Sequence, residues 1–116
     1  MGFAVVQMVA IVARFELKDE AAARGFDALV EETASAIQAS EPDTLIYAVH
    51  RVEDAPLSRL FYELYASRDA HGQHEAGEHT KRFLAELSQY LESVRVEFLE
   101  APSGKVPSTE SGDSRQ

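Results

Sequence analysis

The sequence predicts an α+β domain, because strand-like and helix-like hydrophobic patterns alternate along one short chain. Short apolar runs rich in Val, Ile, Tyr and Phe predict four strands, and apolar residues at helical spacing predict two long helices. The chain has 116 residues and is 45% hydrophobic, which is enough for one domain with its own core. The predicted order is strand 5–17, a helix that starts after Asp19 and stops before Pro42, strand 44–51, strand 59–66, helix 78–91 and strand 94–99.

The first strand and helix follow from local patterns. Both alternating sets of residues in 5–17 are largely apolar, so this strand is expected to be covered on both faces. Asp19 can cap the next helix. The residues at helical spacing that form its apolar stripe are Phe26, Leu29, Val30, Thr33, Ala34 and Ile37. Pro42 prevents the helix from continuing.

The second half predicts a hairpin and a second helix. The polar segment 53–56 has turn chemistry, which joins the second and third strands. The segment 69–77 is polar and His-rich and predicts a short helical turn, with Gly72 and Gly77 opposing one unbroken helix. The resulting βαββαβ order is the ferredoxin-like arrangement, a four-stranded antiparallel sheet with both helices on one face. We expect this domain to span residues 1–101 and residues 102–116, rich in Ser, Gly and Pro, to be disordered.

Two helices cover only one side of a sheet, yet the first strand is apolar on both sides. The other side therefore needs a partner, and a second copy of the chain packed sheet to sheet is the economical one. We expect a homodimer.

Composition excludes several classes of function. The net charge of -9 and the scattered basic residues argue against a nucleic-acid surface. The chain has no Cys, which excludes disulfides, thiolate metal sites and a Cys nucleophile. The apolar run 3–13 is too short to span a bilayer and lacks the features of a signal peptide, so we expect no membrane partner and a cytoplasmic location.

The candidate site lies in residues 41–87, which hold all four histidines and three of the four tyrosines. His74 is the first candidate for a base, and a surface histidine paired with Glu78 is the alternative. Glu63 lies between Phe61 and Tyr65 on one strand face, where a carboxylate is costly to bury unless it is paired. It is either tied to Arg14 or Arg51, or is a tuned acid.

The candidate site residues also carry a family resemblance. The pattern Glu41-Pro42-x-Thr44-Leu45-x-Tyr47, then Tyr62-Glu63-x-Tyr65, then His74-x-x-x-x-His79 before a helix resembles the antibiotic biosynthesis monooxygenase (ABM) family. The resemblance extends to about Pro102. It implies a ferredoxin-like fold that dimerises into an α/β barrel, and oxygenation of quinols or polyketide aromatics without metal or flavin. Members of the family usually have Gly at the position that Asp43 occupies in this chain, and many have Trp at the position of Tyr65.

The leading hypothesis is a cofactor-independent monooxygenase acting on a quinol, an anthrone or a similar small aromatic. Its substrate must supply electrons to oxygen as an anion, so the protein must remove a proton and exclude water. We expect His74 and Glu63 to be catalytic and Tyr47, Tyr65, His79 and Phe83 to bind substrate. No metal site is expected, because Glu78 stands where the H-E-x-x-H motif needs His. The alternatives are a non-catalytic or haem-binding dimeric module, and an isomerase of a small hydroxy-carbonyl compound.

Overall fold

The computed structural model describes residues 7–107. Within them lie four strands and three helices. Their bounds are β1 (Val9–Leu17), α1 (Glu20–Ser40), β2 (Thr44–Val52), β3 (Ala55–Tyr65), α2 (Arg68–Ala76), α3 (Glu78–Leu87) and β4 (Leu91–Leu99).

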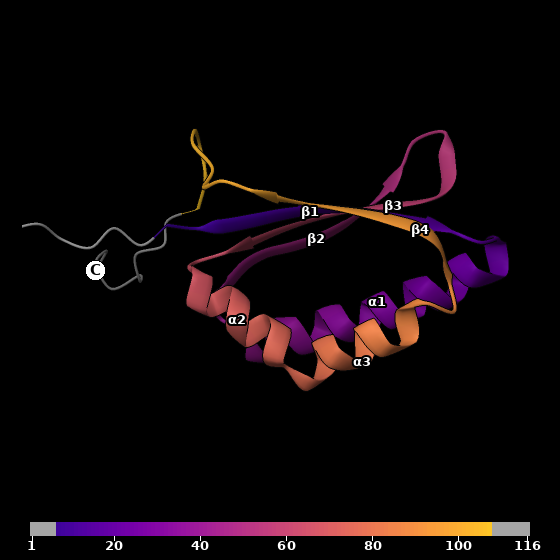
Figure 1. Cartoon of the computed structure of the whole chain (residues 1–116), viewed down its shortest axis with the longest axis horizontal. Coiled ribbons are helices and arrows are strands. Elements are labelled where there is room, and N and C mark those ends of the chain that lie inside the picture. The colour runs from indigo at the N-terminus through magenta and orange to yellow at the C-terminus, as the bar shows by residue number, and fades with distance from the viewer. Residues whose placement is uncertain (1–6, 108–116) are drawn as a thin grey trace, which may run out of the picture.

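The strands form one antiparallel sheet in the order β2-β3-β1-β4, in which β1 pairs with both β3 and β4. All three helices lie on one side of this sheet (Figure 1). The predicted ferredoxin-like fold is therefore confirmed, and its first and last strands are neighbours.

The core between sheet and helices is built on four phenylalanines. Phe15 and Phe61 on neighbouring strands have ring centroids 4.7 Å apart, and Phe26 of α1 lies 5.3 Å from Phe15. Phe83 of α3 completes the cluster, 6.1 Å from Phe26. Tilted and edge-on contacts of this kind add stability beyond the area that they bury.

An ion pair also ties α1 to β3. Asp27 accepts two hydrogen bonds from the Arg59 guanidinium, at 2.9 and 3.0 Å, and the Arg59 side chain is only 3% exposed. Buried charge is tolerated here because the pairing is bidentate. No pattern in the sequence indicated this pairing.

The helices begin at side-chain caps. Asp19 accepts a hydrogen bond from the Ala22 backbone N–H, as predicted, and Ser67 accepts one from Ala70 at the start of α2. Gly77 separates α2 from α3 and adopts an extended conformation. The predicted short turn is thus a full nine-residue helix.

Other boundaries also differ from the prediction. The hairpin turn is shorter than expected, because Val52 already pairs with Ala55 and Pro56 lies inside β3. Asp54 makes this tight turn with a φ of 62°, a conformation that Asp tolerates better than most residues. β4 begins at Leu91 rather than at residue 94.

The ends of the chain are described only in part. Residues 102–107 of the predicted disordered tail form no helix or strand, and residues 108–116 lie outside the described residues, as do positions 5 and 6 of the predicted first strand. None of the helices in the described part is long and apolar enough to cross a membrane.

The phenylalanine cluster predicts a large cost for truncating its centre. Phe26→Ala should lower the free energy of unfolding by about 3–5 kcal/mol, because Phe26 is fully buried and the surrounding rings cannot close the cavity. Urea denaturation measures this loss. Leu84→Ala is the control, since Leu84 is 60% exposed and its truncation should change stability by less than about 0.5 kcal/mol. A loss below about 1 kcal/mol for Phe26→Ala would contradict the assigned core.

Candidate active site

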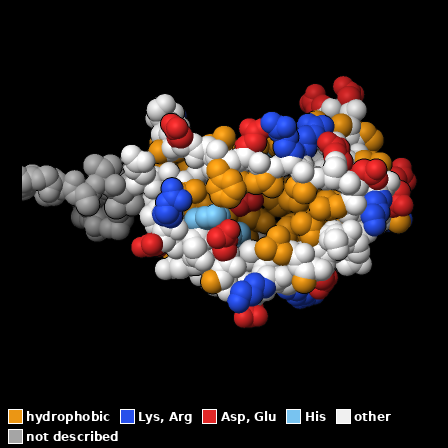
Figure 2. All heavy atoms as spheres, in the orientation of Figure 1, with side chains coloured by type: hydrophobic (Ala, Val, Ile, Leu, Met, Phe, Trp, Pro, Cys, Tyr) orange, Lys and Arg blue, Asp and Glu red, His pale blue; other side chains and the backbone are white. Residues whose placement is uncertain are grey.

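A cavity of about 280 Å³ lies between the helices and the sheet. It is open on the β4 side, where Figure 2 shows apolar side chains gathered around a hollow in the surface. The mouth is lined by Leu84 of α3 and by Val94, Val96 and Phe98 of β4, all substantially exposed. Deeper in, the walls are mainly apolar and include Phe15, Phe61 and Phe83.

One end of the cavity is polar. Glu63, His71, His74 and Thr80 line it there, beside the ring of Tyr47, which lies 5.8 Å from the His74 ring. Among the described lining residues there is no Lys or Arg, so the cavity offers no cation to an anionic group of a ligand. An apolar pocket with a few convergent polar groups is typical of a small-molecule site.

Glu63 reaches this end from β3. Its carboxylate accepts a hydrogen bond of 2.5 Å from the Tyr65 hydroxyl. The expected pairing with Arg14 or Arg51 is wrong, because Arg14 contacts Glu16 and Arg51 contacts Asp27. Burial raises the pKa of Glu63 above its ordinary value, although the Tyr65 hydrogen bond and nearby histidines oppose the rise.

The two tyrosines beside Glu63 remain neutral. Burial and the charge of Glu63 raise the pKa of both Tyr47 and Tyr65 above the ordinary value. Tyr47 lines the cavity, whereas Tyr65 is fully buried behind it and contacts the cavity through Glu63.

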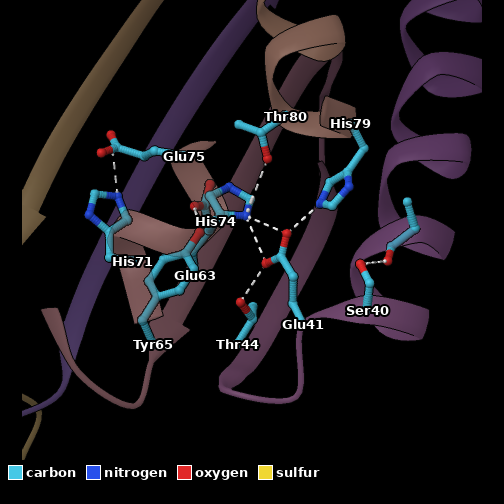
Figure 3. A network of polar contacts seen from close by, with 11 residues as sticks. Ser40, Glu41, Thr44, Glu63, Tyr65, His71, His74, Glu75, His79 and Thr80 are labelled. Atoms are coloured by element: carbon cyan, nitrogen blue, oxygen red, sulfur yellow. Dashed lines mark hydrogen bonds and ion pairs between the residues drawn. The ribbon is translucent and has the colours of Figure 1, made fainter. Parts of the chain in front are cut away.

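A second carboxylate, Glu41, lies behind His74 and was not predicted as a site residue. Figure 3 shows Glu41 between His74 and His79. Its Oε1 is 2.9 Å from His74 Nδ1, its Oε2 contacts His79 Nε2, and the Thr44 hydroxyl donates to Oε1 at 2.7 Å. Burial alone would raise the pKa of Glu41, but these hydrogen bonds outweigh it and leave the pKa below its ordinary value. The position of Glu41 in the Glu41-Pro42 pair of the family pattern is the feature of the sequence that could have identified it as a site residue.

The break at Gly77 brings the two histidines to one carboxylate. On one continuous helix, side chains five residues apart point in different directions. Here His74 lies in the last turn of α2 and His79 in the first turn of α3, so each approaches Glu41 from its own helix.

The structure therefore divides the predicted site residues into two groups. His74, Glu63, Tyr47 and Phe83 line the cavity together. Tyr65 and His79 do not line it: Tyr65 contacts Glu63, and His79 contacts Glu41, with which it lines a separate, smaller hollow.

The raised pKa of Glu63 predicts a pH-dependent effect on stability. In the unfolded chain Glu63 ionises near 4.5, and in the folded chain it ionises at higher pH, so its ionisation opposes folding as pH rises through that folded value. Glu63→Gln should therefore raise the melting temperature at pH 8 and lose this advantage below about pH 4. Thermal unfolding of both proteins across this range is the measurement. Equal gains at pH 8 and pH 4 would count against a buried, ionising Glu63.

Known proteins share this architecture. A candidate antibiotic biosynthesis monooxygenase from Caulobacter crescentus is 26% identical, with a TM-score of 0.78 over 84% of this chain and 92% of that one. A Mycobacterium tuberculosis protein is 25% identical, with a TM-score of 0.76 over 86% and 99% of the two chains. A candidate monooxygenase from Lactobacillus acidophilus is 28% identical, with a TM-score of 0.74 over 82% of this chain and 45% of that one.

The chain matches no curated protein. The profile of the antibiotic biosynthesis monooxygenase family, in contrast, matches residues 8–86, which include β1 to α2 and most of α3. This match and the related structures support a general monooxygenase-like role. The chain belongs to the antibiotic biosynthesis monooxygenase family.

Proposed function

We propose that this protein is a monooxygenase that needs no metal or flavin and oxidises a quinol, an anthrone or a similar small aromatic. The observation that carries the proposal is the cavity itself, in which a histidine and a partly buried carboxyl group line the end of an apolar pocket. Family membership supports the oxygenase class, and the walls support an aromatic substrate.

The size and polarity of the cavity narrow the substrate. About 280 Å³ lies near the lower end of the range for ligand pockets, roughly 300–1,000 Å³, and fits a small ring system. Its apolar walls and the lack of Lys and Arg among its described lining residues disfavour carboxylated or phosphorylated substrates. A neutral aromatic with hydroxyl or keto groups at the polar end fits both properties.

The reaction starts with a proton transfer. His74 takes a proton from the substrate hydroxyl or from an acidic C–H group, which gives a phenolate or enolate that can transfer electrons to O₂. A carbon of this anion forms a bond to O₂, and the peroxide takes up a proton. The hydroperoxide then loses water, so that one oxygen atom remains in the product carbonyl and the other leaves as water.

Glu63 is the second acid–base group in this scheme. Its raised pKa keeps a carboxyl proton available at higher pH than usual, so Glu63 can donate to a substrate oxygen while His74 accepts a proton. Tyr47 and Phe83 hold the ring, and the apolar walls exclude water from the anion.

Oxygen uptake tests this function. With 1,4-naphthoquinol and anthrone as probes, the protein should accelerate O₂ consumption above autoxidation, with product formed in equal amount. His74→Ala should lower the rate by about 10²–10⁴-fold, the usual contribution of a positioned base. Gln38→Ala is the control, since Gln38 is exposed on α1, outside both the cavity and the sheet face of the proposed dimer. Uptake equal to autoxidation with both probes, or full activity in His74→Ala, would refute the assignment.

The same proposal includes a cytoplasmic homodimer formed through the sheet faces that point away from the helices. Val12, Tyr62 and Ala48 are neighbours across three strands and alternate with the residues that line the cavity. They remain partly exposed, so an apolar strip runs across this face.

A charge in this strip tests the dimer. Tyr62→Glu should shift the protein from dimer to monomer in sedimentation velocity at micromolar concentration, because the carboxylate would be buried unpaired at the interface. Leu84→Glu, on the helix side, should leave the dimer intact. A monomeric unmodified protein would contradict the proposed dimer without bearing on the chemistry of the cavity.

A further inference from the structure

Glu41 occupies a position that helix energetics do not explain. It is the C-cap of α1, where the negative end of the helix dipole disfavours a carboxylate. Its side chain is also only 10% exposed, so water does little to stabilise its charge. Local rules are broken in this way mainly at functional sites.

Three donors from three different elements hold this carboxylate in place. Thr44 belongs to β2, His74 to α2 and His79 to α3. Together they contact both carboxylate oxygens, which leaves the group little freedom to turn.

The contact to His74 determines where the imidazole carries its proton. An ionised carboxylate only accepts hydrogen bonds, so Nδ1, at 2.9 Å from Oε1 and 3.2 Å from Oε2, must carry the hydrogen. The Thr80 hydroxyl lies 3.5 Å from the same nitrogen, too far to compete. In neutral His74 the unprotonated nitrogen is therefore Nε2.

Nε2 is also the accessible nitrogen. It has no hydrogen-bond partner among residues 7–107, yet in that part of the chain no polar side-chain atom is both buried and unpartnered. Since His74 is a lining residue of the cavity, Nε2 is open to a ligand there.

We propose that Glu41 is a positioning residue, which fixes His74 as the Nδ1–H tautomer so that Nε2 is the atom that takes the substrate proton. The inference rests on the proposed function for its catalytic part only. His79 and Thr44 act one step further out, because they orient Glu41. The carboxylate also stabilises the imidazolium that forms when Nε2 takes the proton.

Glu41, His74 and His79 also have the residue types of a metal site, and one ligand atom from each lies within 4.8 Å of the others. Two ligands on a zinc ion, at about 2.0–2.1 Å each in tetrahedral geometry, are about 3.3 Å apart. Glu41 lies closer than this to both histidines, so the cluster has the spacing of direct hydrogen bonds.

The tautomer can be measured without any substrate. Long-range ¹H–¹⁵N correlation spectra of the full-length protein, labelled at histidine, distinguish Nδ1–H from Nε2–H, and His74→Gln assigns the signal. We expect Nδ1–H for His74 in the wild type and a mixture of tautomers in Glu41→Gln, because a primary amide can both donate and accept. An Nε2–H signal for wild-type His74 overturns the inference. The inference is also overturned if adding zinc chloride or EDTA changes these signals, because such a change would place a metal ion in the cluster.

Kinetics test the catalytic half. Glu41→Gln should lower kcat by about 10-fold or more, with little change in KM, since the cavity walls are unchanged. Glu78→Gln is the charge-matched control: Glu78 is exposed, beside His79 in the chain, and its substitution should leave kcat unchanged. Wild-type kcat in Glu41→Gln overturns the positioning role. If the tautomer is as expected but no probe is oxidised even by the wild type, the proposed function fails and the tautomer assignment stands.

Discussion

The incomplete cover of the sheet is the constraint on which the rest of this structure depends. Helices on one side pack over the strands through the four-phenylalanine cluster, but the helix-facing residues of β4 remain exposed. The register places Phe98 beside Ile11 and Val96 beside Ala13, so these side chains extend the core surface outward and leave it open. Close packing on three strands and a gap at the fourth produce a cavity without any loop or lid.

The polar end of the cavity depends on two buried carboxylates with opposite properties. Both are desolvated, yet the pKa of Glu63 is raised and that of Glu41 is lowered. The difference comes from their partners: a tyrosine hydroxyl for Glu63, and a threonine and two histidines for Glu41. One fold thus places a carboxyl group with a raised pKa and a carboxyl group with a lowered pKa near the same imidazole, that of His74.

Patterns of hydrophobic residues were enough to predict the fold class and the order of the strands and long helices, because alternation and helical spacing are local properties. They did not decide which way the candidate site residues point; Tyr47, Glu63, His74 and Phe83 were chosen for their chemistry and for the family resemblance, and the structure places them along one cavity. The contacts of Glu41 and Arg59 could not be predicted in this way. Each depends on residues more than thirty positions apart, which meet only when α1 packs on the sheet.

Gly77 has a consequence that reaches beyond helix geometry. A methyl group placed there would lie 3.1 Å from His79 Cε1 and 3.4 Å from the His74 carbonyl oxygen, tighter than or at the limit of ordinary contact. Gly77, which has no side chain, thus lies between His74 and His79, the two histidines that contact Glu41. A larger residue at this one backbone position would press on His79 and the end of α2, and so alter the Glu41 cluster without replacing any side chain that lines the cavity.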